Sequence, residues 1–156
     1  MASEAAKKLS KKNVAVIPTN SIPEGLVACL RLDPSIGFDE LVEEMHDSLE
    51  EVDTGEITTA TRSIDINGIK VKKGEVISLL NGNLVCSSKS IFQACEELLI
   101  KAQTEDKEHI TVFYGENTDQ AMIDGVAKQI KETYSDHELE IHNGGQPHYQ
   151  FILAIE

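Results

Sequence analysis

The spacing of apolar residues changes several times along the chain, and each change predicts a new element. Apolar positions that recur every three or four residues predict helices, while short β-branched runs bounded by turn residues predict strands. This rule predicts helices over residues 3–12, 23–32, 38–52, 88–102 and 118–134. It predicts strands over residues 13–17, 57–61, 69–71, 76–80, 84–86, 109–114, 137–142 and 149–155. The chain is therefore expected to be an α/β protein.

The order of these elements indicates two parts. Thr54-Gly55 follows the third predicted helix and is interpreted as its break. We therefore expect an N-terminal part over residues 1–55 and a compact mixed-sheet α/β part over residues 56–156.

Two local signals and the last residues define the sheet of the second part. Asn81-Gly82 predicts a hairpin between the strands on either side of it. Strand, helix and strand between Ile110 and Ile141 predict a parallel pair joined by a right-handed crossover. The apolar run from Tyr149 to Ile155 predicts a buried terminal strand, entered through a glycine turn.

The predicted helix over residues 38–52 is amphipathic and acidic. Its apolar stripe consists of Phe38, Leu41, Val42, Met45, Leu49 and Val52. Its opposite face and end carry Asp39, Glu40, Glu43, Glu44, Asp47, Glu50, Glu51 and Asp53, without a basic residue in the helix. Such a face is typical of a solvated surface, and it is also suited to docking a basic partner.

The overall charge narrows the classes of partner. The chain has 27 acidic and 14 basic residues and a formal net charge of −13. This balance argues against binding to nucleic acid or to an anionic membrane surface, both of which draw on clustered cations. No apolar run has the length of a membrane-spanning helix, so we expect a cytoplasmic protein without membrane insertion. Cys29, Cys86 and Cys95 lack metal-ligand spacing and are expected to be reduced and structural.

No motif for catalysis or cofactor binding is present in the sequence. The turn at Gly115 between a strand and a helix has one glycine, whereas phosphate-binding loops need several. It is interpreted as a simple turn in which Thr118 caps the following helix. His137, His142 and His148 are interpreted as surface histidines, since neighbouring positions on a strand face opposite sides and zinc needs converging ligands. We therefore predict no catalytic residue, cofactor site or metal site.

Five segments together resemble one bacterial family. They are residues 16–25, 54–62, 69–74, 112–116 and 142–156, and their order and spacing carry the likeness over almost the whole chain. On these residues the chain resembles the C-terminal region of the bacterial fatty acid kinase catalytic subunit, formerly described as dihydroxyacetone-kinase-like or Dak phosphatase.

The resemblance implies a specific role. Members have an N-terminal kinase domain that uses ATP and Mg²⁺, a middle domain, and a C-terminal region related to the DegV fold. That region docks a fatty-acid-binding DegV-type protein, so that the kinase domain can phosphorylate the bound fatty acid carboxylate for phospholipid synthesis. The N-terminal part of this chain is then a truncated Rossmann-like piece, and Met1 is an internal methionine or a fragment boundary. The chain itself is expected not to catalyse.

The resemblance and the loop chemistry together suggest a set of partner-binding residues. They are Thr19, Ser21, Ile22, Gly25, Arg62, Gly115, Gly144, Gly145, Gln146, Pro147 and Tyr149. For the first three, helix capping, partner contact and fatty-acid contact remain alternatives. Gly144 or Gly145 is expected to adopt positive φ, whereas Gln146 is expected to have no steric duty in the turn.

Other functions and assemblies remain open at this point. The chain is alternatively a stand-alone DegV-type fatty-acid or small-molecule binding module, or a dihydroxyacetone-kinase-type catalytic fragment. The partners expected are the fatty-acid-binding protein and the kinase domain. A homo-oligomer is also possible, because a strand over residues 13–17 has unpaired edges.

Overall fold

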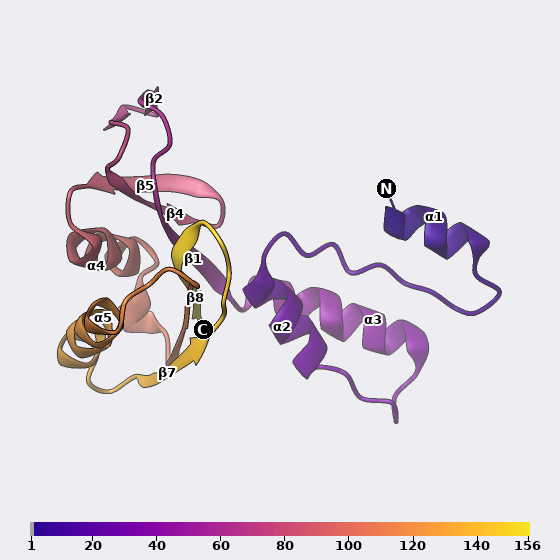
Figure 1. The fold of residues 1–156 in the computed structure, drawn as a ribbon. Helices are drawn as coiled ribbons and strands as arrows, with labels where there is room; N and C mark the ends of the chain where they lie inside the picture. The colour runs from indigo at the N-terminus through magenta and orange to yellow at the C-terminus, as the bar shows by residue number, and fades with distance from the viewer. Residues whose placement is uncertain (1) are drawn as a thin grey trace. The chain divides into compact units, whose positions relative to one another are not determined.

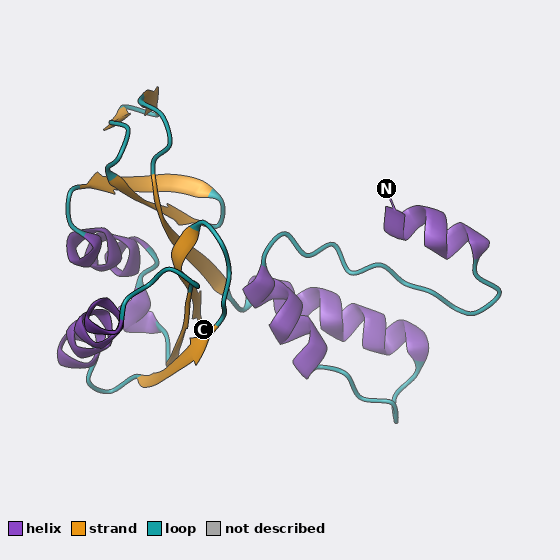
Figure 2. Cartoon of the chain, viewed as in Figure 1, coloured by secondary structure: helices purple, strands orange, loops and turns teal. Residues whose placement is uncertain are grey.

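The computed structural model describes residues 2–156 and divides into two compact units (Figure 1). The N-terminal unit ends at Val52, and the C-terminal unit spans Asp53–Glu156. The strands lie in the C-terminal unit, whereas the regular elements described in the N-terminal unit are helices (Figure 2).

The N-terminal unit is built from helices. It contains α1 (Ala2–Leu9), α2 (Ile22–Leu30), α3 (Phe38–Asp47) and the 3₁₀ turn η1 (Ser48–Glu50). Ser21 caps α2, because its hydroxyl accepts the backbone N–H of Glu24 at 3.2 Å. Arg31, which follows α2, forms an ion pair with Glu51 after η1. The acidic segment is therefore partly neutralised by a cation from another element, which the helical pattern alone did not predict.

The prediction of a strand over residues 13–17 is wrong. This segment has no regular secondary structure, and residues 2–52 contain no strand. A strand is stabilised by hydrogen bonds to a neighbouring strand, and the described part of this unit supplies none. A short apolar run therefore met the sequence criterion for a strand without the pairing that a strand needs.

The C-terminal unit contains a mixed sheet of six strands in the order β5-β4-β1-β8-β6-β7. These strands are β1 (Asp53–Thr59), β4 (Val76–Leu80), β5 (Asn83–Ser88), β6 (His109–Tyr114), β7 (Glu138–Asn143) and β8 (Tyr149–Ile155). All pairs are antiparallel except β6 and β7, which are parallel as predicted. The α/β class and the mixed sheet are thus confirmed.

Two helices pack on one face of this sheet (Figure 1). They are α4 (Ile91–Lys101), followed by the 3₁₀ turn η2 (Thr104–Asp106), and α5 (Gln120–Thr133). The terminal strand β8 lies between β1 and β6, and its residues Phe151, Leu153 and Ile155 are fully buried beneath the helices. The buried terminal strand predicted from the apolar run is confirmed.

Gly55 lies inside β1, which begins at Asp53, so the interpretation of this glycine as a break is wrong. A Cβ atom at Gly55 would stand 2.7 Å from Cδ2 of the buried Leu98 on α4. The glycine therefore makes room for helix packing, a tertiary reason that its sequence neighbours do not reveal. The preceding helix α3 ends at Asp47, earlier than predicted, and continues as η1.

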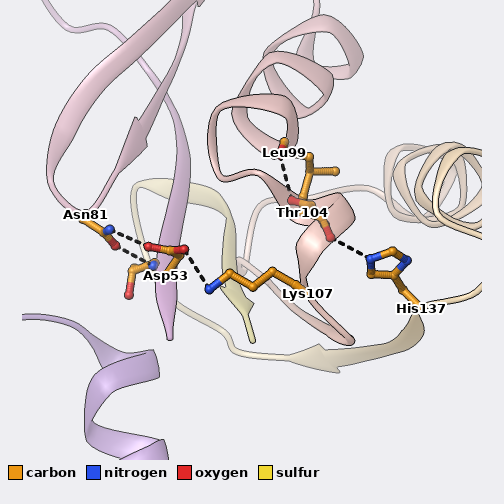
Figure 3. Close-up of polar contacts among 7 residues, drawn as sticks. Asp53, Asn81, Leu99, Thr104, Lys107 and His137 are labelled. Carbon is orange, nitrogen blue, oxygen red and sulfur yellow. Dashed lines mark hydrogen bonds and ion pairs between the residues drawn. The ribbon is translucent and has the colours of Figure 1, made fainter. Parts of the chain in front are cut away.

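The Asn81-Gly82 hairpin is confirmed and also anchors β1 (Figure 3). Asn81 and Gly82 have φ values of 49° and 75°, as a type I′ turn requires. The Asn81 side chain accepts the Thr54 N–H at 2.8 Å and donates to Asp53 at 2.7 Å. Lys107 completes this clamp with an ion pair to Asp53 at 3.2 Å.

Candidate functional site

A polar cleft opens where the turn after β6 meets the loop between β7 and β8. It has a volume of about 170 Å³. Its lining consists of Asn117, Thr118, Gln146, His148, Tyr149 and Gln150. These residues come from two segments that are far apart in the sequence, so the cleft is a product of the tertiary fold.

The loop that forms one wall is fixed by hydrogen bonds to the end of β6. The backbone N–H groups of Gly144 and Gly145 both donate to the carbonyl of Tyr114, at 3.0 and 3.2 Å. The side-chain amide of Gln146 donates to the carbonyl of Phe113 at 2.9 Å. The Gln146 carbonyl in turn accepts the N–H of Glu116 at 3.2 Å. The loop is therefore held in one conformation by its own backbone and one side chain.

Gln146 was expected to have no steric duty in the turn, but its side chain has a hydrogen-bonding one, because it ties the loop to β6. A Cβ atom at Gly144 would stand 2.0 Å from the Gln146 side-chain oxygen. Gly144 thus leaves room for that amide, and glycine suits position 145 because its φ is +60°. The predicted positive φ is confirmed at Gly145, and His148 also adopts it, with φ of 72°.

Gly115 brings the two walls together. A Cβ atom there would lie 2.1 Å from the carbonyl oxygen of Tyr149 and 2.8 Å from that of Gln146. Its N–H donates to the Gln150 carbonyl at 2.9 Å. This glycine therefore allows close backbone packing between the β6 turn and the start of β8.

The N-terminus of α5 lies beside the cleft. Asp119 caps the helix, with its carboxylate accepting the Met122 N–H at 2.8 Å. The prediction of Thr118 as the cap is wrong, because the Thr118 hydroxyl donates to the Gln150 carbonyl at 3.0 Å instead. Thr118 thus fixes the turn to β8.

The electrostatics of the cleft favour hydrogen bonding. Burial raises the pKa of Glu56 on β1. The pKa of Tyr149 is also raised, mainly by the negative charge of Glu56 and to a smaller extent by burial. The Tyr149 hydroxyl therefore stays protonated at neutral pH and is a hydrogen-bond donor. Amide, hydroxyl and imidazole side chains line the cleft, so it presents a polar contact surface.

Several of the histidines and cysteines considered for metal binding or catalysis are engaged within the protein or buried. His142 contacts Glu140 at 2.8 Å, and Nε2 of His137 donates to the Thr104 carbonyl at 2.7 Å (Figure 3). Burial raises the pKa of the Cys86 and Cys95 thiols to about 12. In the described part of the chain, no group of three or more His, Cys, Asp or Glu side chains is placed to hold a metal ion.

The structure brings together about half of the residues predicted to contact a partner. Gln146 and Tyr149 line the cleft, while Gly115, Gly144, Gly145 and Pro147 form the turns that build it. Arg62 lies in the C-terminal unit at a separate groove. Thr19, Ser21, Ile22 and Gly25 belong to the N-terminal unit, where the capping alternative is confirmed for Ser21.

Sequence reasoning missed Asn117, Thr118, His148 and Gln150 as residues of this cleft. Asn117 had a local signal, since it follows a glycine turn that leads into a helix N-terminus. Gln150 had none, because its place depends on the contacts of its carbonyl with Gly115 and Thr118 in the turn after β6.

The whole sequence matches one described family. The FakA-like C-terminal family, which is named for a fatty acid kinase, matches residues 1–156. The chain belongs to this family. It is 38% identical over 156 residues to an uncharacterized protein of Staphylococcus epidermidis, and 36% identical over 156 residues to one of Staphylococcus aureus. The whole chain is covered in both comparisons, and it spans 28% of the length of each relative.

Solved structures confirm the fold. A DegV family protein from Thermus thermophilus, described for its fatty acid binding, superposes with a TM-score of 0.60 at 15% identity, covering 97% of this chain and 64% of that one. A DegV family protein from Eubacterium eligens loaded with heptadecanoic acid gives a TM-score of 0.52 at 13% identity, covering 85% of this chain and 55% of that one. The chain therefore has a DegV-like fold. None of the described helices combines the length and apolarity needed to cross a membrane.

Proposed function

We propose that this chain is the partner-docking C-terminal region of a fatty acid kinase subunit. In this proposal it positions a fatty-acid-binding protein of DegV type, in the cytoplasm, for ATP-dependent phosphorylation of the fatty acid carboxylate. The phosphoryl transfer, with ATP and Mg²⁺, belongs to a kinase domain outside this chain. The observation that carries the proposal is the match of all 156 residues to the C-terminal family.

The cleft supports docking more than enclosure of a ligand. Pockets that enclose small molecules usually have volumes of about 300 to 1,000 Å³ and predominantly apolar walls. The cleft has about 170 Å³ and is lined by polar side chains, which are the groups that a protein surface uses for hydrogen bonds. Its loop is already fixed by the hydrogen bonds of Gln146 and the glycines, so docking requires little ordering of the loop.

Calorimetric titration with a DegV-type fatty-acid-binding protein tests the proposal. Asn117→Ala and His148→Gly each remove an exposed side chain from the cleft, and glycine retains the positive φ at position 148. We expect each variant to weaken binding about tenfold while the melting temperature stays nearly unchanged. Lys128→Ala, on the exposed surface of α5, is the control and leaves affinity unchanged.

The absence of measurable binding by the unmodified chain, at concentrations up to about 1 mM, would overturn the docking role. Equal affinity of the cleft variants and the control would place docking elsewhere on the chain.

A second candidate is a fatty-acid-binding module in its own right. The observation that favours it is the fold shared with DegV family proteins described with bound fatty acids. Native mass spectrometry of the purified chain separates the two functions. A co-purified fatty acid in stoichiometric amount supports the binding module, whereas its absence after incubation with excess fatty acid supports docking alone.

A further inference from the structure

A small hairpin stands apart from the main sheet of the C-terminal unit. It consists of β2 (Ile64–Ile66) and β3 (Ile69–Val71), which form a separate two-stranded sheet, and β2 lies at the top of the view in Figure 1. Its turn residues Asn67 and Gly68 have φ values of 52° and 83°, again a type I′ turn. The same Asn-Gly signal that predicted the hairpin at residues 81 and 82 is thus present here as well, and the prediction of hairpins from the sequence missed it.

The base of the hairpin is fixed to the main sheet. The Ala60 N–H donates to the Glu75 carbonyl, and the Gly74 N–H donates to the Ala60 carbonyl, both at 2.8 Å. The Glu75 carboxylate accepts the Lys72 N–H at 2.9 Å and the Ser87 hydroxyl at 3.0 Å. These bonds lower the pKa of Glu75 and keep it ionised at the base. The hairpin is thus held at its base by several hydrogen bonds.

An apolar groove of about 190 Å³ lies between the hairpin and β4 and β5. Its apolar lining includes Ile64, Ile66, Val71, Ile77, Leu79 and Leu84. Val71 is buried, but Ile64 and Ile66 remain 38% and 37% exposed. In the register of the hairpin Ile64 pairs with Val71 and Ile66 with Ile69, so apolar side chains share one face of it.

The segment that carries the hairpin is basic, in contrast to the rest of the chain. Between Thr61 and Glu75 there are four basic side chains, Arg62, Lys70, Lys72 and Lys73, and two acidic ones, Asp65 and Glu75. The stretch has a net charge of +2 in a chain of −13. Asp65 lies opposite Lys70 in the hairpin, and Glu75 binds the base. Among the described residues Arg62 and Lys73 have no ion-pair partner within the chain.

We propose that this groove is a second docking surface, for a protein that presents an apolar side chain surrounded by carboxylates. The inference rests on the proposed function, with the fatty-acid-binding protein as the partner. The apolar walls accept the side chain, and Arg62, which lines the groove, pairs with the acidic rim. Lys73 is the second cation of this contact, because its backbone N–H donates to the Ser63 hydroxyl next to Arg62.

The size and charge of the groove favour a protein partner over a fatty acid chain and over an anionic membrane. A volume of about 190 Å³ is below the range of about 300 to 1,000 Å³ that small-molecule pockets require, so a whole acyl chain is a poor fit. An anionic membrane would attract four cations but would repel a chain with a net charge of −13. A protein surface with a small apolar contact avoids both difficulties.

Titration of the chain with the DegV-type fatty-acid-binding protein also tests this surface, with two hairpin variants. Arg62→Glu with Lys73→Glu reverses the rim charge, and Ile64→Ser with Ile66→Ser removes the apolar contact. We expect each pair to weaken binding by about tenfold or more, and the charge-reversed pair to lose most of the salt dependence of the affinity. The control pair Lys128→Glu with Lys131→Glu, on α5, makes the same charge change elsewhere and is expected to alter affinity less than about twofold.

The outcomes separate this inference from the docking role itself. If the unmodified chain binds and the hairpin variants bind as the control does, the second surface is refuted while the docking role stands. If the unmodified chain does not bind, both are refuted. A third outcome is that the unmodified chain binds phosphatidylglycerol vesicles and the hairpin variants do not, while all of them bind the protein partner equally. This result would identify the groove as a lipid-binding surface and overturn the proposal. Retention of the melting temperature by the charge-reversed pair excludes loss of folding as the cause of weaker binding.

Discussion

At Gly115 the backbones of two loops touch, and no side chain fits between them. A Cβ atom would stand 2.1 Å from one carbonyl oxygen and 2.8 Å from another, and both belong to backbone that is fixed by hydrogen bonds. The residue therefore controls the shape of the cleft without contacting a partner itself. Its contribution comes from the absence of a side chain, which a search for chemically active residues overlooks.

Gly115→Ala is expected to lower the free energy of unfolding by about 1 to 3 kcal/mol, because the loop at Tyr149 must move away. Urea denaturation measures this change. Gly125→Ala is the matched control: its Cβ would meet only the ring end of Phe92, which is 42% exposed and is free to turn. Alanine also favours a helix over glycine by about 1 kcal/mol, so the control is expected to be neutral or stabilising. Equal destabilisation of both variants would contradict the close approach at Gly115.

At the scale of elements, the β4–β5 turn stabilises more than its own hairpin. The Asn81 side chain accepts the Thr54 N–H and donates to Asp53, so one turn residue joins the hairpin to the start of β1 (Figure 3). Lys107 reaches the same carboxylate from the segment before β6. Strands that are distant in the sequence thus share one polar clamp at the edge where β1 begins.

A pair of substitutions separates the two duties of Asn81. Asn81→Gly keeps the positive φ accessible and removes both side-chain hydrogen bonds, so we expect a loss of about 1 to 2 kcal/mol in the free energy of unfolding. Asn81→Ala removes the same bonds and adds the strain of a left-handed residue, for a further loss of about 1 kcal/mol. Urea denaturation of both variants measures the difference. If alanine were as stable as glycine, backbone conformation would not be what selects asparagine here.

At the scale of the whole molecule, the two units differ in how many of their backbone N–H and C=O groups form hydrogen bonds within the chain. The C-terminal unit closes around a core that includes Phe151, Leu153 and Ile155, and β8 is bonded to strands on both sides. In the N-terminal unit the amides of residues 14–17 donate to no backbone carbonyl within the described chain. Local stability is therefore expected to be uneven along the chain.

Hydrogen exchange measured by mass spectrometry is expected to show this contrast. Peptides covering residues 13–17 should exchange within seconds, and peptides from β8 should exchange only through global unfolding. The measurement is repeated at tenfold dilution, because pairing of this segment with a second copy would protect it only at the higher concentration. Strong protection at both concentrations would show that the segment is hydrogen-bonded within one chain.

The sequence by itself determined the elements whose cause is local. Strand β6, the parallel strand β7, the hairpin at Asn81-Gly82 and the buried terminal strand β8 were all predicted, because apolar spacing and turn residues record burial and chain reversal directly. The same information predicted positive φ at Gly144 or Gly145, and Gly145 adopts it. Glycine and asparagine in tight turns are local signals, because the positive φ that such a turn needs is set by the few residues of the turn itself.

Only the tertiary structure decided what depends on contacts between distant segments. The segment over residues 13–17 has strand composition without a partner strand, and Gly55 looked like a break although it makes room for Leu98. The cleft arises where Gly115 meets the backbone of Tyr149, and Gln146 holds its loop to β6. Such positions are set by pairing and packing across the sheet, and these interactions leave no periodic trace in the sequence around each residue.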